Sequence, residues 1–495
     1  MNRSRFAFAL AMAALAAILV PSSLTAQITF ERTYGGTDWD EGYSVQQTAD
    51  DGYIISGYTG SFGAGGYDVY LIKTDATGNT IWTKTYGGTE WEEGHSVEQT
   101  TDSGYIITGY TNSFGAGYDD IYLIKTNANG DANWTRTYGG ADNDEGYSVQ
   151  QTADGGYIVA GSTSSFGAGS WDVYLIKTKS NGDTTWTRTF GGAWDDGGYS
   201  VQQTADDGYI ITGYTHSFGA GYWDVYLIKT DTNGDTIWTR TYGGTNHEHG
   251  ASVQQTADGG YIIAGHTESY GAGYWDVYLI KTDANGDTSW TRTFGDDDQD
   301  YGWSVVQTSD GGYTIASTTA PWGPGYDDII LIRTDSCGDT CWTRTFGGDS
   351  ADLAYAVQQT ADGGYVLAGS TTSFGPWMAN FYLIKTDSLG NVAVAEPKAS
   401  PPRASALSLS CEPNPFAGTT AIRLSPFAIR SSPLTLRVYD AQGRVVRSLS
   451  SVLSSPSSLT WNGTDDLGRA LPSGTYFVRS DAGSEHATAR IVLQR

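Results

Sequence analysis

The 495-residue sequence is poor in basic residues, in cysteine and in long apolar segments. Its 28 lysines and arginines face 55 aspartates and glutamates, and the formal net charge of −27 argues against nucleic acid or an anionic membrane as a partner. Three cysteines are too few for a disulfide-based scaffold. No stretch after residue 26 is apolar enough to cross a bilayer, so we expect no transmembrane segment in the mature protein.

The positions of the cysteines allow one possible disulfide. Cys337 and Cys341 flank a single hairpin tip and could bond outside the cell, but the hairpin register does not place them directly opposite each other. Cys411 has no evident partner. The sequence does not decide whether Cys337 and Cys341 are bonded.

Residues 1–26 have the layout of a secretory signal peptide. Arg3 and Arg5 precede an apolar run over residues 6–20, and a small-residue cleavage site ends at Ala26. An uncleaved anchor is the alternative, but the apolar run is short for a membrane span. We expect the mature protein to begin at Gln27 and to work outside the cytoplasm, secreted or associated with the outer membrane at the cell surface.

The central part of the chain is a tandem repeat with a constant period of 52 residues. A tyrosine that follows a short glycine-containing turn marks each of the seven copies, at Tyr53, Tyr105, Tyr157, Tyr209, Tyr261, Tyr313 and Tyr365. The 65 glycines punctuate runs rich in aromatic and β-branched residues, a pattern typical of all-β proteins. No copy carries an insertion, so each unit must make the same contacts with its neighbours.

Each unit is predicted to form four short strands. In the third copy these cover residues 146–152, 157–163, 172–178 and 185–190. The third strand is almost continuously apolar at its centre, as expected of a strand buried on both faces. We expect Asn181-Gly182 to form a type I′ turn between the third and fourth strands.

Seven four-stranded units of this length predict a seven-bladed β-propeller over residues 27–395. A tryptophan of the fourth strand recurs in six copies, and the next position in register is Val394, where the pattern ends. One period before the first of these tryptophans lies Phe30. We therefore expect residues 28–34 to supply the fourth strand of the last unit and to close the ring. The six tryptophans are predicted to pack between blades; they are Trp82, Trp134, Trp186, Trp238, Trp290 and Trp342.

The segment 278–296, YLIKTDANGDTSWTRTFGG, resembles the blade of quinoprotein-type propellers. The resemblance covers about 20 residues of every unit and implies blade geometry only. The adjacent cysteine pair of some quinone-dependent dehydrogenases is absent from the sequence, so no quinone cofactor is expected.

The variable loops predict where a ligand binds. In a propeller the loops from the fourth strand to the next first strand share one face with those between the second and third strands. Here both sets are acidic and aromatic, which suits carbohydrate stacking, cation binding or a protein partner. The loops after the SFGAG motif add Tyr67, Tyr118, Tyr326 and Trp377 to this face. The candidate ligand-binding residues are Trp39, Trp91, Trp171, Trp194, Trp223 and Trp275.

An acidic residue recurs in the same loop of all seven copies. One interpretation is that each carboxylate caps a turn by accepting backbone N–H bonds. The alternative is a ring of carboxylates that binds cations, with calcium as the possible ion. A second acidic series runs from Asp68 to Asp328, with Asn380 in the last copy. The candidate metal ligands are Asp40, Glu92, Asp144, Asp196, Glu248, Asp300 and Asp352.

No catalytic constellation stands out from the repetition. The fifth copy comes nearest, with His247, His249 and His266, but a lone His-x-His pattern is a weak metal signal. We therefore expect a non-catalytic binding or scaffold protein for a glycan or a protein ligand. An extracellular propeller enzyme that acts on polysaccharide, a hydrolase or a lyase, is the alternative.

The composition changes after Val394. A linker rich in proline, alanine and serine covers residues 396–406, and residues 407–495 contain the motifs PNP (413–415), YDAQGR (439–444), WNGTDDLG (461–468) and PSGTY (472–476). In this order they resemble the C-terminal sorting domain of the type IX secretion pathway, an Ig-like β-sandwich, and also the Ig-like fold of flagellar hook-capping proteins. The first resemblance implies a domain that directs secretion through contact with the secretion machinery, with later cleavage or anchoring left open. A plain Ig-like spacer is the alternative.

Overall fold

The computed structural model describes residues 27–319, 327–376, 378–392, 408–425, 435–440, 443–449, 458–482 and 485–495. The expected signal peptide, the expected linker, Tyr326 and Trp377 lie outside these residues. The chain divides into two compact units, residues 1–393 and 394–495. Within the described residues no helix has the length and hydrophobicity needed to cross a bilayer.

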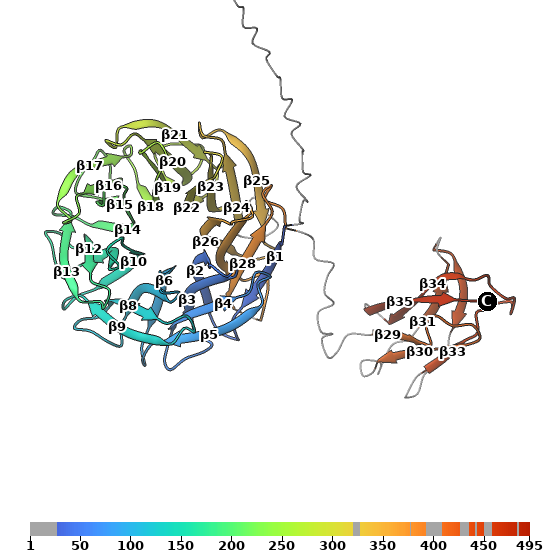
Figure 1. Cartoon of the computed structure of the whole chain (residues 1–495). Coiled ribbons are helices and arrows are strands. Elements are labelled where there is room, and N and C mark those ends of the chain that lie inside the picture. The colour runs from blue at the N-terminus through green and yellow to red at the C-terminus, as the bar shows by residue number, and fades with distance from the viewer. Residues whose placement is uncertain are drawn as a thin grey trace, which may run out of the picture. The chain divides into compact units, whose positions relative to one another are not determined.

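The first unit consists of seven four-stranded antiparallel sheets in a propeller-like arrangement around a central space (Figure 1). The first six sheets each take four consecutive strands: β2 (Asp40–Gln47), β3 (Tyr53–Thr59), β4 (Asp68–Thr74), β5 (Thr80–Tyr86); β6 (Glu92–Gln99), β7 (Tyr105–Thr111), β8 (Asp120–Thr126), β9 (Ala132–Tyr138); β10 (Asp144–Gln151), β11 (Tyr157–Thr163), β12 (Asp172–Thr178), β13 (Thr184–Phe190); β14 (Asp196–Gln203), β15 (Tyr209–Thr215), β16 (Asp224–Thr230), β17 (Thr236–Tyr242); β18 (Glu248–Gln255), β19 (Tyr261–Thr267), β20 (Asp276–Thr282), β21 (Thr288–Phe294); β22 (Asp300–Gln307), β23 (Tyr313–Thr319), β24 (Asp328–Thr334), β25 (Thr340–Phe346). The seventh sheet contains β26 (Asp352–Gln359), β27 (Tyr365–Thr371), β28 (Asn380–Thr386) and β1 (Phe30–Tyr34).

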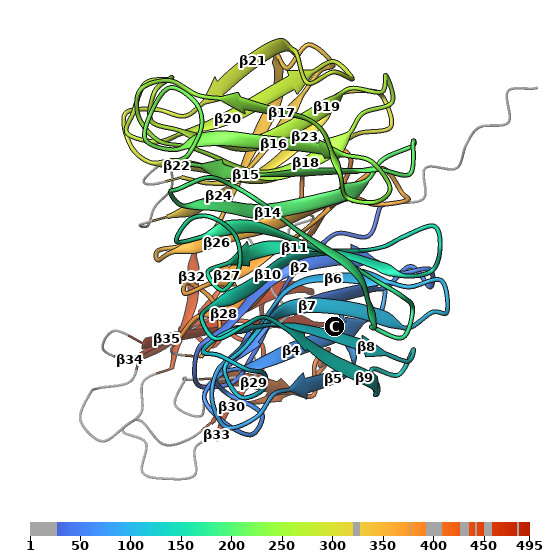
Figure 2. The same cartoon turned by 90° about the vertical axis from the view of Figure 1, so that its left-hand side faces the viewer.

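The position of a strand in its sheet decides its burial. The first strand of each sheet lines the central space and the fourth lies at the periphery (Figure 1). The strands run from one face of the ring to the other, with the connecting loops at the two faces (Figure 2). In β12 every residue is buried, as the apolar third strand predicts, whereas β13 is largely exposed. Apolar side chains of neighbouring sheets pack together, so each hydrophobic core lies between two sheets.

The N-terminal strand completes the last sheet. β1 pairs antiparallel with β28, with Phe30 opposite Lys385 and Tyr34 opposite Phe381. Phe30 also belongs to the core between the seventh and the first sheets. Residues 30–34 therefore occupy the place in the seventh sheet that the repeat pattern assigns to residues 28–34.

The hairpin at Asn181-Gly182 differs from the expected type I′ turn. Gly182 has a φ of +82°, but Asn181 is not among the residues with positive φ. The Gly182 amide donates to the Lys179 carbonyl at 3.0 Å, and the register shifts between Lys177 and Thr178. This is a longer turn that ends with a left-handed glycine and a bulge, so only one residue needs positive φ. The type I′ prediction is wrong.

The second unit is an all-β domain with two sheets. One has the strand order β29-β30-β33 and the other β32-β31-β34-β35. Its core packs Trp461 against Phe416 and Tyr476, with ring centroids 5.5 and 5.4 Å apart. The strands are β29 (Ser408–Glu412), β30 (Thr420–Ser425), β31 (Thr435–Tyr439), β32 (Val445–Leu449), β33 (Ser458–Trp461), β34 (Gly474–Ala482) and β35 (Glu485–Leu493).

All three cysteines are free. Cys337 and Cys341 are exposed and unbonded, and Cys411 of the second unit is partly buried.

Candidate functional site

A β-bulge at the same position of every repeat builds the centre of the first unit. In the third sheet Gly146 pairs with Gly161 and Ser148 with Ala160, so Tyr147 has no partner across the ladder. The same shift occurs in the first strand of the other six sheets. A bulge redirects its extra side chain. The seven bulged residues are Tyr43, His95, Tyr147, Tyr199, Ala251, Trp303 and Tyr355.

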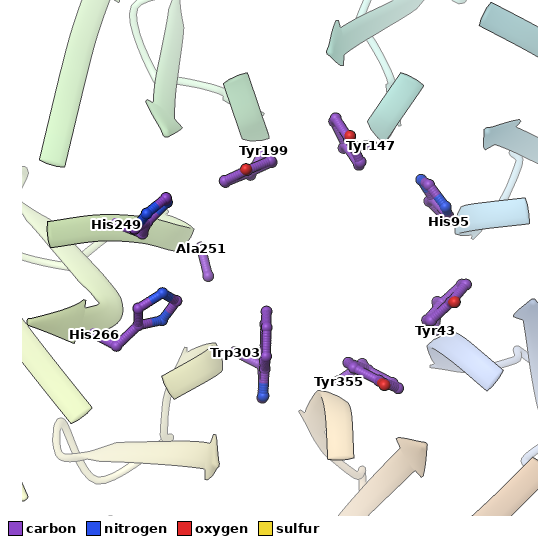
Figure 3. Close-up of a pocket in the computed structure, with 9 residues that line it drawn as sticks. All are labelled: Tyr43, His95, Tyr147, Tyr199, His249, Ala251, His266, Trp303 and Tyr355. Atoms are coloured by element: carbon purple, nitrogen blue, oxygen red, sulfur yellow. The ribbon is translucent and has the colours of Figure 1, made fainter. Parts of the chain in front are cut away.

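The bulged residues line a central cavity of about 480 Å³. The fifth repeat has Ala251 where the other six have a ring, and two further residues of that repeat, His249 and His266, complete the lining (Figure 3). We call the eight rings around the cavity the aromatic collar: Tyr43, His95, Tyr147, Tyr199, His249, His266, Trp303 and Tyr355.

The collar is continuous. Each ring lies 5.0–6.5 Å, centroid to centroid, from the next one, from Tyr43 round to Tyr355 and back to Tyr43. Five of these eight pairs are T-shaped, which aromatic quadrupoles favour, and three are stacked, among them His95 on Tyr147 with an interplanar angle of 8°. The mutual contacts hold the rings in place around the cavity.

Charged and polar side chains adjoin the collar unevenly. Glu93 Oε2 lies 3.1 Å from His95 Nε2, and the Tyr147 hydroxyl donates to Glu145. Although burial opposes it, the hydrogen bond from His95 holds the pKa of Glu93 below its usual value. Glu41 occupies the same register in the first repeat. The first three repeats therefore bring three carboxylates to one side of the collar.

The opposite side carries neutral imidazoles. Burial, helped by the neighbouring His247, lowers the pKa of His249 to about 4. Burial also places the pKa of His266 well below its usual value, with a further contribution from His249. Both rings are uncharged at neutral pH, and each has one nitrogen that donates a hydrogen bond and one that accepts.

Two chains of ring contacts connect the collar with the loop face. One leads from Tyr43 through Tyr58 and Tyr67 to Trp91. The other leads from His249 through Trp223, His247, Tyr222 and His216 to Trp194. Trp91 is 57% exposed and Trp194 62% exposed. We call these chains the aromatic tracks; they join two exposed tryptophans, Trp91 and Trp194, to the cavity through ring contacts.

The candidate ligand-binding tryptophans fall into two groups. Trp39, Trp91 and Trp194 are exposed on the loops that precede the first strands. Trp223 and Trp275 are partly buried and both contact His249, at 5.0 and 5.8 Å between ring centroids. Trp171 is also partly buried, and no ring contact joins it to the tracks among those found in the described residues.

The seven candidate metal carboxylates are buried, and each accepts a backbone hydrogen bond from the loop that precedes its strand. Asp144 Oδ2 accepts from the Gly140 amide at 2.8 Å and from the Ser165 hydroxyl at 2.7 Å. The equivalent amide bond is present in the other six repeats, with distances of 2.7–3.1 Å. Within the described residues no three His, Cys, Asp or Glu side chains gather as a metal site. The bonds show the capping role, and cation binding by this series stays a prediction.

The His247-Glu248-His249 segment does not converge on one point. Glu248 is fully buried, and its carboxylate accepts from the Thr267 hydroxyl and the Gly244 amide, both at 2.8 Å. His247 contacts Trp223 and Tyr222, and His249 belongs to the collar. The two imidazoles therefore pack among aromatic rings and do not share a site with the Glu248 carboxylate.

Most residues of the collar are not among the sites that the sequence predicts. Residue Tyr147 reads as one member of an ordinary alternating strand, because a bulge leaves no mark in a single copy. A comparison of all copies at 52-residue spacing does contain the signal, since six of the seven positions carry an aromatic or imidazole ring.

A family model matches part of the second unit, and one curated protein and several solved structures are similar to the chain. Residues 414–485 match the family of FlgD Ig-like domains. The chain is 27% identical over 181 residues to the regulatory protein FlaEY of Caulobacter vibrioides, an alignment that covers 31% of this chain and 19% of that protein. The chain thus spans only about a fifth of the length of that relative.

Several solved structures are similar at low identity. PorZ, a surface component of the type IX secretion system of Porphyromonas gingivalis, is 12% identical, with 93% of this chain and 60% of that chain covered and a TM-score of 0.41. The β-propeller domain of the Trilobed protease from Pyrococcus furiosus is 9% identical, with coverages of 72% and 97% and a TM-score of 0.40. TM-scores of this size carry no argument about function.

Proposed function

We propose that this chain is an exported, non-catalytic binding protein whose loop face binds a glycan. In this proposal the seven sheets form a seven-bladed β-propeller closed by β1. The C-terminal domain directs type IX secretion, and the protein is displayed on the outer membrane or released.

The aromatic tracks are the observation that carries the glycan proposal. Sugar rings stack their C–H faces on exposed aromatic rings, and their hydroxyl groups donate to carboxylates. Trp91 and Trp194 offer such faces at the outer ends of the tracks. The loops that hold them are acidic, with Glu90 beside Trp91 and Asp195 beside Trp194. A glycan chain that crosses the loop face would meet stacking platforms with hydrogen-bond acceptors next to them.

The export proposal rests on the signal-like pattern of residues 1–26 and on the order of the motifs in residues 407–495. The FlgD Ig-like match agrees with the sandwich that these motifs imply. Its test is expression of the chain with and without residues 407–495 in a bacterium that has the type IX pathway, followed by cell fractionation. We expect the full chain at the surface or in the medium and the shortened chain in the periplasm. Export of both would show that the C-terminal domain is a spacer.

The glycan proposal is tested by screening the full chain on a glycan array. We expect saturable binding that weakens at least tenfold in Trp91→Ala and in Trp194→Ala, because stacking residues dominate such contacts. Ile237→Ala is the matched control, since Ile237 is 55% exposed but lies on the peripheral strand β17. Binding only to a protein ligand, or equal loss in the control, would contradict the glycan proposal.

A further inference from the structure

The aromatic collar lies apart from the exposed tryptophans, and the charge around it is unbalanced. Glu41, Glu93 and Glu145 adjoin it from the first three repeats, and Asp119 lies close to the last two. Burial raises the pKa of Asp119, and the carboxylates of Glu145 and Glu93 raise it further. Burial and Glu93 likewise raise the pKa of Glu41. Like charges are therefore held together on one side of the cavity.

This negative charge has little compensation from the protein. Across the described ranges, the only basic side chain that forms an ion pair with these four acids is His95, through Glu93. The tyrosine hydroxyls that donate to them, such as that of Tyr147, carry no charge. Buried carboxylates without a full cationic partner are costly, and a cation bound in the neighbouring cavity would lower that cost.

The other side of the cavity offers an unused acceptor. His266 is only 8% exposed, and its Nδ1 has no hydrogen-bond partner in the described part of the chain. The ring is hydrogen-bonded to the Gly302 backbone, which leaves Nδ1 as the free nitrogen. His266 lines the cavity beside Ala251, where the repeat has no ring of its own (Figure 3). Nδ1 is itself buried, so in the described part of the chain it is an unsatisfied acceptor on a residue that lines the cavity.

We propose that the aromatic collar binds an organic cation, an alkylammonium or quaternary ammonium group, with its charge directed toward the carboxylates of the first three repeats. Aromatic rings attract cations through their quadrupoles, and five of the eight collar rings belong to tyrosine or tryptophan. A cavity of about 480 Å³ suits a small molecule or a single cationic side chain. The same carboxylates repel anionic ligands.

The proposal is tested by calorimetric titration of the full chain with choline and with 3,3-dimethylbutan-1-ol, its neutral isostere. We expect saturable binding of choline and at least tenfold weaker binding of the neutral alcohol, because the two differ only in charge. Equal affinity for the two compounds would overturn the proposal. Absence of choline binding would also overturn it, if choline is raised 50-fold above about 1 mM, the Kd of a weak complex.

Variants locate the site. Glu93→Gln removes one charge and keeps the shape, and we expect choline affinity to fall at least fivefold. Glu90→Gln is the matched control, because Glu90 is exposed in the loop before β6 and carries the same charge. Equal loss in both variants would mean that only the overall charge matters and would overturn the assignment to the collar.

Filling the cavity gives a second readout that does not depend on charge. Ala251→Tyr restores the ring that the other repeats carry at the bulge. We expect it to abolish choline binding without loss of the cooperative unfolding transition. Retained binding in a folded Ala251→Tyr protein would show that the collar is not the site. Failure of the glycan array leaves these outcomes unaffected, since they concern a different ligand and different residues.

Discussion

Phe30 of β1 lies against Gly78 of the hairpin between β4 and β5, so closely that a Cβ at residue 78 would come within 2.6 Å of Phe30 Cε2. In the next pair of sheets Trp82 has the same relation to Gly130, at 2.8 Å. Phe30 is thus the counterpart of the repeated tryptophans, and it connects the seventh sheet with the first. The contact joins residues from the two ends of the repeat region.

Phe30→Ala should lower the free energy of unfolding by about 3–4 kcal/mol, because it removes a buried ring at the junction of the two ends. Phe30→Trp is the matched variant, since six repeats carry tryptophan in this register, and we expect less than about 1.5 kcal/mol of change. Urea unfolding measures both. Equal, small effects would show that the junction contributes little to stability.

The buried basic residue of each third strand, a lysine in six sheets and Arg333 in the sixth sheet, should make stability depend on pH. Lys177 Nζ lies 2.9 Å from Asp154 Oδ2 and donates to the Thr178 carbonyl. Burial tends to raise the pKa of Asp154, but hydrogen bonds from Thr152 and Lys177 outweigh this effect and hold the pKa at about 2. Because the folded pKa is depressed, this stabilisation is present above pH 3.8 and is lost as the pH falls toward 2.

Asp154→Asn should therefore lower the free energy of unfolding at pH 7 by about 1 kcal/mol, a value reduced for the solvent exposure of Asp154. The difference from wild type should vanish near pH 2. Lys177→Arg is the control, since the sixth repeat pairs Arg333 with Asp310. Unfolding curves at several pH values would refute this account if the difference were the same at pH 7 and pH 2.

Glu98 should change the pH dependence of stability in the opposite direction to Asp154. It stands where most repeats have glutamine, and burial raises its pKa from 4.5 to about 7 despite a hydrogen bond from the Gln151 amide. A raised pKa means that the folded state holds the proton more tightly, so stability falls as the pH rises from about 4.5 to about 7. Glu98→Gln should raise the free energy of unfolding by up to about 3 kcal/mol at pH 7.5 and leave it unchanged at pH 4. A gain that is independent of pH would contradict this.

Calcium should leave stability unchanged. The carboxylates of the recurring acidic series already accept bonds from their own loops, as Asp144 does from Gly140 and Ser165. Melting temperatures with millimolar calcium and with EDTA should agree within about 1 °C. A saturable rise with calcium that is lost in Asp144→Asn would instead support the ring of cation ligands that the sequence analysis considered.

The repeat period made much of the first unit predictable. Four strands per unit and the place of Phe30 follow from contacts that recur every 52 residues. The collar did not follow, because the bulge at Tyr147 depends on how Gly146 and Ser148 pair across the sheet, which one strand alone does not reveal. The role of Asp144 does not follow from the sequence for a related reason, since a loop aspartate can cap a turn or bind a cation and only the partner atoms distinguish the two.

The most direct test of the central claim combines binding and turnover in one sample. The full chain is incubated with the best glycan from the array, the bound fraction is measured over a concentration series, and the glycan is then recovered and sized. We expect saturable binding, a loss of at least tenfold in the Trp91→Ala/Trp194→Ala double variant, and intact glycan. Shortened products would establish an enzyme, and an isotherm unchanged by the double variant would contradict the loop-face site.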